Sequence, residues 1–163
     1  MFVLGVDPGL TRCGYGCVEQ LRRGARPVAL GVLRTSKDDP LPKRLADLQL
    51  GLRALVAELQ PDVVAVEQVF FQVNVRTAMA VGQASGIVMA EAHAAGAEVV
   101  QYTPNQVKDA VAGYGAAGKE QIAHMVQTLL GLPEAPRPPD AADAAALALC
   151  HLAHAPLRAK VRA

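Results

Sequence analysis

Short apolar runs alternate with amphipathic repeats along this chain, and the pattern predicts an α/β fold. Residues 2–7 and 62–67 each carry an unbroken apolar stretch that ends in a carboxylate, which is typical of a buried strand. Residues 14–19 and 28–34 predict two more strands joined by a turn, so that with 2–7 they would form an antiparallel meander. Residues 98–101 predict a fifth short strand.

Helical spacing of apolar residues accounts for the remaining segments. Leucines recur every three or four residues through 40–60, and Pro61 is expected to stop that helix. The other predicted helices are 75–95, 104–112, 119–130 and 140–155. We expect Pro156 to end the last helix, which would leave 1–155 as a single domain and 156–163 as a short basic tail. The predicted class is an α/β sandwich with a mixed five-stranded sheet flanked by helices.

Composition excludes several broad classes. Of the 163 residues, 52% are hydrophobic and 19% are charged, which excludes an intrinsically disordered chain. No apolar run reaches the roughly 18 residues of a membrane span, and no cationic segment precedes the first strand, so we expect neither a membrane protein nor a signal peptide. The three cysteines are odd in number and lack metal-site spacing, which indicates reduced thiols in a cytoplasmic protein.

Four carboxylates lie where elements begin or end. Asp7 and Glu67 close two predicted strands, and Asp140 and Asp143 open the last helix three residues apart, on one helical face. If the two strands run parallel, Asp7 and Glu67 converge at one edge of the sheet. Singly, each has another interpretation: Asp140 as a helix N-cap, Asp143 as a first-turn acid, Asp7 as a turn former and Glu67 as a surface residue.

Taken together the four carboxylates favour a joint site. Clustered like charges at the ends of buried elements cost free energy unless a cation compensates them. Oxygen ligands suit Mg²⁺ or Mn²⁺ and not Zn²⁺. Two such ions about 4 Å apart can activate a water and stabilise the leaving 3′-oxygen of a phosphodiester. The pattern therefore predicts a metal-dependent phosphodiesterase.

Net charge permits a nucleic-acid substrate without requiring one. The chain carries +1, so that without the four carboxylates its remainder carries +5. Basic residues cluster locally, and a phosphate interacts with such a local cluster more than with the net charge of the chain. They are Arg22, Arg23 and Arg26, and near the end of the chain Arg158, Lys160 and Arg162.

Three further motifs have competing interpretations. Residues 113–119 resemble a phosphate-binding P-loop, but Glu120 replaces the required Ser or Thr and the segment follows a helix. We therefore reject nucleotide hydrolysis. Lys119 can still hold a DNA phosphate. Cys150, with two nearby histidines, lacks the second ligand pair of a zinc site. Phe70, next to another phenylalanine, is either half-exposed core or a wedge that stacks on an unpaired base.

Several motifs in order along the chain resemble the RuvC Holliday junction resolvases. They are Gly5-Val6-Asp7-Pro8-Gly9 with Gly14-Tyr15-Gly16, Ala65 to Phe70 with Asn74, Gln106-Val107-Lys108 through Gly118-Lys119, His124-Met125-Val126, and Asp140 through Ala148. The resemblance implies a ribonuclease H-like fold and Mg²⁺-dependent symmetric nicking of four-way DNA junctions by a homodimer. It assigns catalytic metal binding to Asp7, Glu67, Asp140 and Asp143, and DNA contacts to Phe70, Lys108 and Lys119.

The resemblance also implies partners. Junction-binding and branch-migration motor proteins of the RuvA and RuvB type are expected beside the enzyme. Two opposed cuts require two sites, and the helix 75–95, rich in small and apolar residues, is the surface we expect to pair in the dimer.

Two alternatives belong to other classes. An actin-like ATPase also begins with a strand that ends in Asp-x-Gly, but it needs two such domains. A catalytically silent DNA-binding relative would have little reason to carry four clustered carboxylates.

Overall fold

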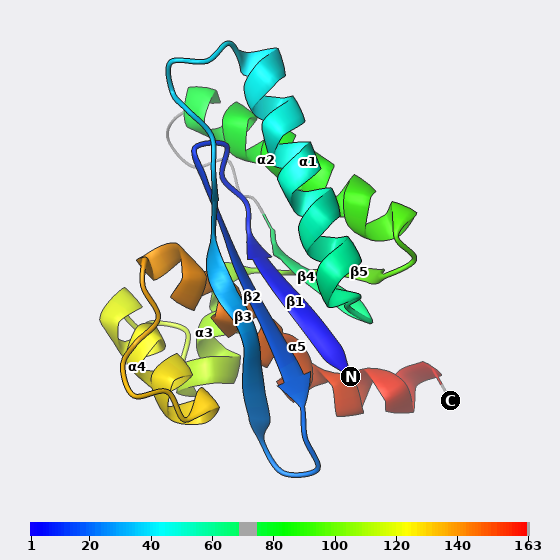
Figure 1. The fold of residues 1–163 in the computed structure, drawn as a ribbon. Coiled ribbons are helices and arrows are strands. Elements are labelled where there is room, and N and C mark those ends of the chain that lie inside the picture. The colour runs from blue at the N-terminus through cyan, green and yellow to red at the C-terminus, as the bar shows by residue number, and fades with distance from the viewer. Residues whose placement is uncertain (69–74, 163) are drawn as a thin grey trace.

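A computed structural model describes residues 1–68 and 75–162, without the side chains of Arg76 and of 156–162. Within these residues five strands form one sheet, and helices cover both of its faces (Figure 1). The strands are β1 Phe2–Asp7, β2 Arg12–Gln20, β3 Ala25–Arg34, β4 Val63–Glu67 and β5 Glu98–Tyr102. The helices are α1 Leu41–Leu59, α2 Val75–Ala94, α3 Pro104–Ala112, α4 Lys119–Leu130 and α5 Pro139–Arg162.

The sheet has the predicted mixed topology, with the strand order β3-β2-β1-β4-β5. β1 and β2 pair antiparallel, as do β2 and β3, so the first three strands form the expected meander. β4 lies parallel to β1, with Val66 opposite Val6, and β5 lies parallel to β4. The carboxyl ends of β1 and β4 therefore meet at one edge of the sheet.

Alternation along the strands divides the core into two layers. Leu4 and Val6 of β1 pack with α1 and α2 on one face, whereas Val3 points to the other face, toward α3, α4 and α5. All three side chains are fully buried. Figure 1 shows α1 and α2 on one side of the sheet and α5 on the other, with α3 and α4 packed against α5. None of the helices described is long and apolar enough to cross a lipid bilayer.

The last helix differs from the prediction at both ends. We expected Pro156 to end it, but α5 continues to Arg162. A proline removes one helical hydrogen bond without forbidding the residues that follow, and those are mostly strong helix formers. Asp140 was a candidate N-cap, but α5 begins at Pro139, because proline suits the first helical position; Asp140 therefore lies inside the first turn.

Candidate active site

The backbone brings strand ends and a helix start together at one edge of the sheet. Asp7 is the last residue of β1 and Glu67 the last of β4. These strands are hydrogen-bonded neighbours, so the two carboxylates project from adjacent positions at the same end of the sheet. The predicted convergence of Asp7 and Glu67 agrees with this register.

Three glycines let α5 lie directly on the strands. A side-chain carbon on Gly5 of β1 would collide with the carbonyl oxygen of Ala144. On β2, a side-chain carbon at Gly14 would collide with the carbonyl oxygen of Asp140, and one at Gly16 would meet the backbone of α5. Only glycine allows this close approach, which places Asp140 and Asp143 beside the end of β1.

A cleft of about 300 Å³ opens at this edge. Its charged lining comprises Asp7, Glu67, Lys108, Lys119 and Asp143, and apolar residues of α3, α4 and α5 complete it. Thr103 caps α3 with its side chain, and Gly118 precedes α4, so the two helices that carry the lysines begin at defined points. Five of the seven predicted site residues therefore lie around one cleft.

Burial and mutual repulsion make the acidic side of the cleft electrostatically unfavourable. Burial, followed by repulsion from Glu67 and Asp143, raises the pKa of Asp7 from its ordinary 3.8 to about 7. The pKa of Glu67 is raised as well, chiefly by burial and then by Asp143. The ammonium group of Lys119 opposes both shifts. The cleft therefore disfavours its own ionised carboxylates and favours an added positive charge.

Two cations already hold the helix carboxylates. Lys119 Nζ lies 3.2 Å from Asp143 Oδ2, and Asp143 in turn raises the pKa of the lysine. Arg12, the first residue of β2, forms an ion pair with Asp140 and holds that carboxylate outside the cleft lining. Sequence reasoning did not single out Arg12. Its closeness to Asp7, five residues earlier, could have drawn attention to it. Its partner Asp140, however, is 128 positions away, so the local sequence does not reveal the ion pair.

In this arrangement the carboxylates do not form a finished metal site. Among residues 1–68 and 75–162, no three Asp, Glu, His or Cys side chains stand close enough together to hold an ion. Asp140 and Asp143 point to Arg12 and Lys119 instead. In the described geometry basic side chains neutralise the two helix carboxylates, whereas Asp7 and Glu67 form no ion pair.

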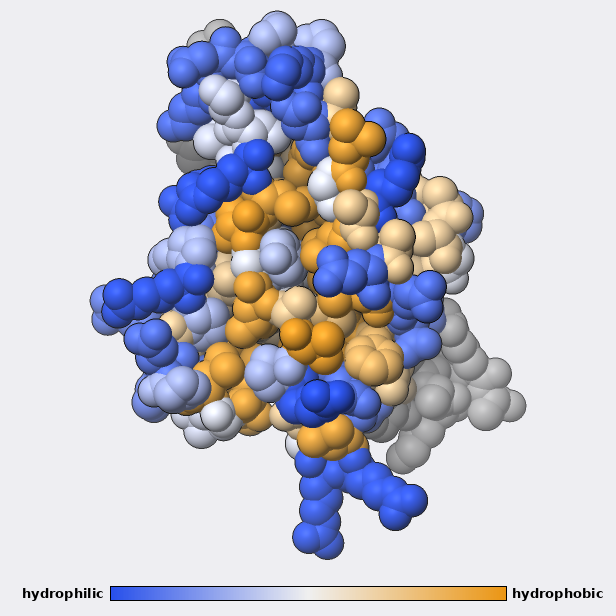
Figure 2. Space-filling model, viewed as in Figure 1, coloured by the Kyte–Doolittle hydropathy of each residue, from blue (hydrophilic) through white to orange (hydrophobic). Residues whose placement is uncertain are grey.

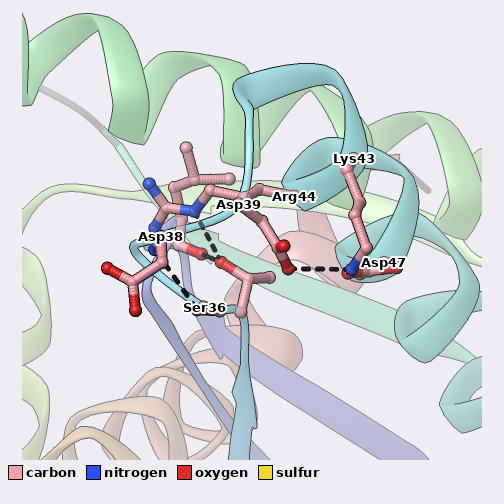
Figure 3. Close-up of polar contacts among 8 residues, drawn as sticks. Ser36, Asp38, Asp39, Lys43, Arg44 and Asp47 are labelled. Carbon is pink, nitrogen blue, oxygen red and sulfur yellow. Dashed lines mark hydrogen bonds and ion pairs between the residues drawn. The ribbon is translucent and has the colours of Figure 1, made fainter.

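A polar network fixes the loop between Asp7 and Arg12. Arg44 of α1 donates from Nη2 to Thr11 Oγ1 at 2.7 Å and from Nε to Thr35 Oγ1 at 3.0 Å. Thr35 donates to the carbonyl oxygen of Leu10 at 2.6 Å. Figure 3 shows Arg44 in this network, and beside it Lys43, whose Nζ lies 2.8 Å from an oxygen of each of its two aspartate partners. The loop that leaves Asp7 is therefore anchored to the start of α1.

The remaining predicted residues have other settings. Phe70 lies outside the described residues. The Sγ of the buried Cys150 lies 3.6 Å from the carbonyl oxygen of Gln106, and Nδ1 of the buried His151 lies 2.9 Å from the hydroxyl of Tyr102. These contacts pack α5 against α3 and β5.

Comparison with known proteins identifies the family. Residues 3–151 match the sequence model of the family described as crossover junction endodeoxyribonuclease RuvC. The chain belongs to the RuvC family. Relatives described as crossover junction endodeoxyribonuclease RuvC include one from Moorella thermoacetica, 48% identical over 158 residues, covering 97% of this chain and 95% of the relative. Another, from Salinispora arenicola, is 53% identical over 164 residues, covering 100% and 94%.

Solved RuvC structures agree with the fold. Thermus thermophilus RuvC superposes with a TM-score of 0.88 at 40% identity, covering 97% of each chain. The same protein in complex with a Holliday junction substrate gives 0.92 at 41% identity, covering 97% of this chain and 96% of the other. A yeast mitochondrial Holliday junction resolvase, 18% identical with a TM-score of 0.69, shares the fold. The predicted ribonuclease H-like class, with its mixed five-stranded sheet, is confirmed.

Proposed function

We propose that this RuvC-family endonuclease resolves Holliday junctions in recombination and DNA repair by cutting two opposed strands symmetrically at the cleft described above. The observation that carries the proposal is the cleft itself. It combines the half-buried, mutually repelling Asp7 and Glu67 with Asp143 and two lysines. The carboxylates suit the cations that phosphodiester hydrolysis needs, and the lysines suit the phosphates.

The carboxylates fit Mg²⁺ as the metal, with two ions per subunit and Mn²⁺ as a substitute. Asp7, Glu67, Asp140 and Asp143 would hold the ions. Their donors are all carboxylate oxygens, which hard cations prefer. The raised pKa of Asp7 shows that the cleft disfavours uncompensated negative charge, which a divalent cation would relieve. When bound, Mg²⁺ would supply an activated water and stabilise the leaving oxygen.

The basic residues of the cleft position the DNA. Lys108 and Lys119 enter the cleft from α3 and α4, where they can contact phosphates on either side of the cut. Hydrolysis adds water to phosphorus and breaks the bond to the 3′-oxygen, which leaves 5′-phosphate and 3′-hydroxyl ends. For Phe70 we propose a stacking contact with an unpaired base at the crossover.

A stripe of α2 supports the proposed homodimer. Val75, Met79, Gly82, Gly86 and Ala90 recur at helical spacing and are exposed, with 73% of Val75 and 58% of Met79 accessible. A two-fold pairing along this stripe would supply the two acidic sites that two opposed cuts require.

The cellular setting follows from the same proposal. We expect the dimer to act with junction-binding and branch-migration motors of the RuvA and RuvB type. All three cysteines are buried and unpaired, which supports a reducing compartment such as the cytoplasm.

A junction cleavage assay tests the function and its site together. Replacing Asp7, Glu67, Asp140 or Asp143 by the matching amide should lower the cleavage rate by orders of magnitude in Mg²⁺, while junction affinity in EDTA stays equal or rises as phosphate repulsion falls. Asp38→Asn makes the same change at an exposed position and should cut normally. Full cleavage by Asp7→Asn would refute the site. A wild-type protein that binds junctions without cutting them would instead indicate a silent relative.

A further inference from the structure

Positive charge is concentrated in the two strands farthest from β4. Residues 12–34, which form β2, the turn and β3, hold five arginines and one acidic residue, Glu19. This segment carries +4 in a chain whose net charge is only +1, so the rest of the chain is net negative. The arginines stand at its two ends: Arg12 and Arg34 at one end, and Arg22, Arg23 and Arg26 at the other.

The far end of this ribbon projects from the protein. In Figure 1 the β2–β3 turn extends past the helices, and Figure 2 shows hydrophilic side chains standing out there. Arg22 and Arg23 are exposed, and no described residue forms an ion pair with either. Arg26 forms an ion pair with Glu19, the one acidic residue of this segment. Gly24 turns the chain with φ of 77°, and the backbone N–H of Leu21 donates to its carbonyl oxygen at 3.1 Å. A hydrogen-bonded turn therefore presents two unpaired arginines to solvent.

The near end belongs to the rim of the active site. Arg12 and Arg34 are directly opposite each other across β2 and β3. Like charges in this position destabilise a sheet. Asp140 compensates Arg12, whereas Arg34 is exposed with no ion-pair partner in the described part of the chain. An anion bound at each end of the ribbon would relieve the repulsion between the arginines there.

The separation of the two ends matches duplex DNA. β2 has nine residues. At a rise of about 3.3 Å per residue, Arg12 and the turn are about 30 Å apart. One helical turn of B-DNA is about 34 Å, the distance after which a phosphate backbone returns to the same side of the duplex. Because β3 is the outermost strand, both basic ends are reachable along one edge of the sheet.

We propose that the β2–β3 ribbon binds one duplex arm of the junction, with phosphates at the rim contacting Arg12 and Arg34 and phosphates one helical turn farther out contacting Arg22 and Arg23. The proposal rests on the junction-cutting function and adds a contact distant from the crossover. An acidic protein segment would also suit arginines. Arginines also lie at the active-site rim, however, and the distance between the two charged ends is close to one helical turn of DNA. Both features favour DNA.

Arm length provides the test, measured as binding in EDTA. Junctions with arms of about six base pairs, closed by loops, end before the turn, whereas arms of about fifteen base pairs pass it, at 3.4 Å per base pair. Wild type should bind the long-armed junction more tightly. Arg22→Gln with Arg23→Gln should weaken long-arm binding roughly tenfold to fiftyfold, lower the salt slope by about two, and leave short-arm binding unchanged.

Three controls sharpen the outcome. Arg22→Lys with Arg23→Lys keeps the charge and should retain most of the long-arm affinity. Lys37→Gln with Lys43→Gln removes two exposed charges outside residues 12–34, so this variant should keep the wild-type preference for the long-armed junction. Equal long-arm affinity of wild type and the double glutamine variant would overturn the proposal and favour an acidic protein ligand. An equal loss at both arm lengths would also overturn it, because the arginines would then act on DNA without reaching one helical turn along an arm. Failure of the nuclease function is separate, since it would appear as absent cleavage by wild type in Mg²⁺.

Discussion

Replacing Asp7 by asparagine should stabilise the metal-free protein, and the gain should depend on pH. Burial and neighbouring carboxylates raise the pKa of Asp7 from 3.8 to about 7 in the folded state. In the unfolded chain this carboxyl loses its proton near pH 4, whereas in the folded protein it keeps the proton until about pH 7. Across that window the folded state binds more protons, so the free energy of unfolding falls as pH rises.

The size of the effect follows from the shift. At 1.36 kcal/mol for each pH unit, the pKa change corresponds to at most about 4 kcal/mol lost between pH 4 and pH 7. That shift already includes the opposing effect of Lys119. Because a neutral amide at this position also loses contact with water, we expect Asp7→Asn to be about 1–3 kcal/mol more stable than wild type at pH 8 in EDTA. For a domain of this size that is a melting temperature higher by roughly 3–10 °C. At pH 4 the two proteins should melt together.

Thermal unfolding in EDTA at a series of pH values measures this difference directly. Asp38→Asn removes an equivalent charge from an exposed position and should track wild type throughout. Adding Mg²⁺ should raise the melting temperature of wild type more than that of Asp7→Asn, because binding to the folded state stabilises it. If Asp7→Asn melted at or below the wild-type temperature at pH 8, Asp7 would not be under the repulsion inferred here.

Two further predictions concern packing and assembly. Gly5→Ala should lower the free energy of unfolding by about 3 kcal/mol or more in chemical denaturation, because its methyl group would overlap Ala144. Gly82→Ala meets open space, and its free energy of unfolding should rise by up to about 1 kcal/mol. Equal stability of the two variants would contradict the close approach of α5. Gly86→Asp places a charge in the exposed stripe of α2 and should sediment as a monomer. Ala57→Asp, which places the same charge on α1, should remain dimeric. A wild type that sediments as a monomer would refute the homodimer.

Much of the fold was predictable because its elements have strong local signals. The leucine repeat before Pro61 predicts α1, and the observed helix ends two residues before that proline. All five strands were predicted, but β2, β3 and β5 are longer than expected. β3 begins at Ala25, although the prediction began it at 28. Its first residues include Ala25 and Pro27, which are poor strand formers, yet pairing with β2 holds them in the sheet. The prediction that Pro156 ends α5 was wrong, because the helix formers after this proline continue the helix to Arg162.

For the site, the sequence by itself determined that Asp7 and Glu67 close strands, and it predicted that they act with Asp140 and Asp143. A carboxylate after an apolar run is a local pattern, and it can be recognised without knowing how the rest of the chain folds. Only the tertiary structure decided where Asp140 and Asp143 point. Their partners are Arg12 and Lys119, at separations of 128 and 24 residues. Such pairs depend on how closely α5 packs on β1 and β2, and that distance is set by contacts between segments that no single stretch of sequence contains.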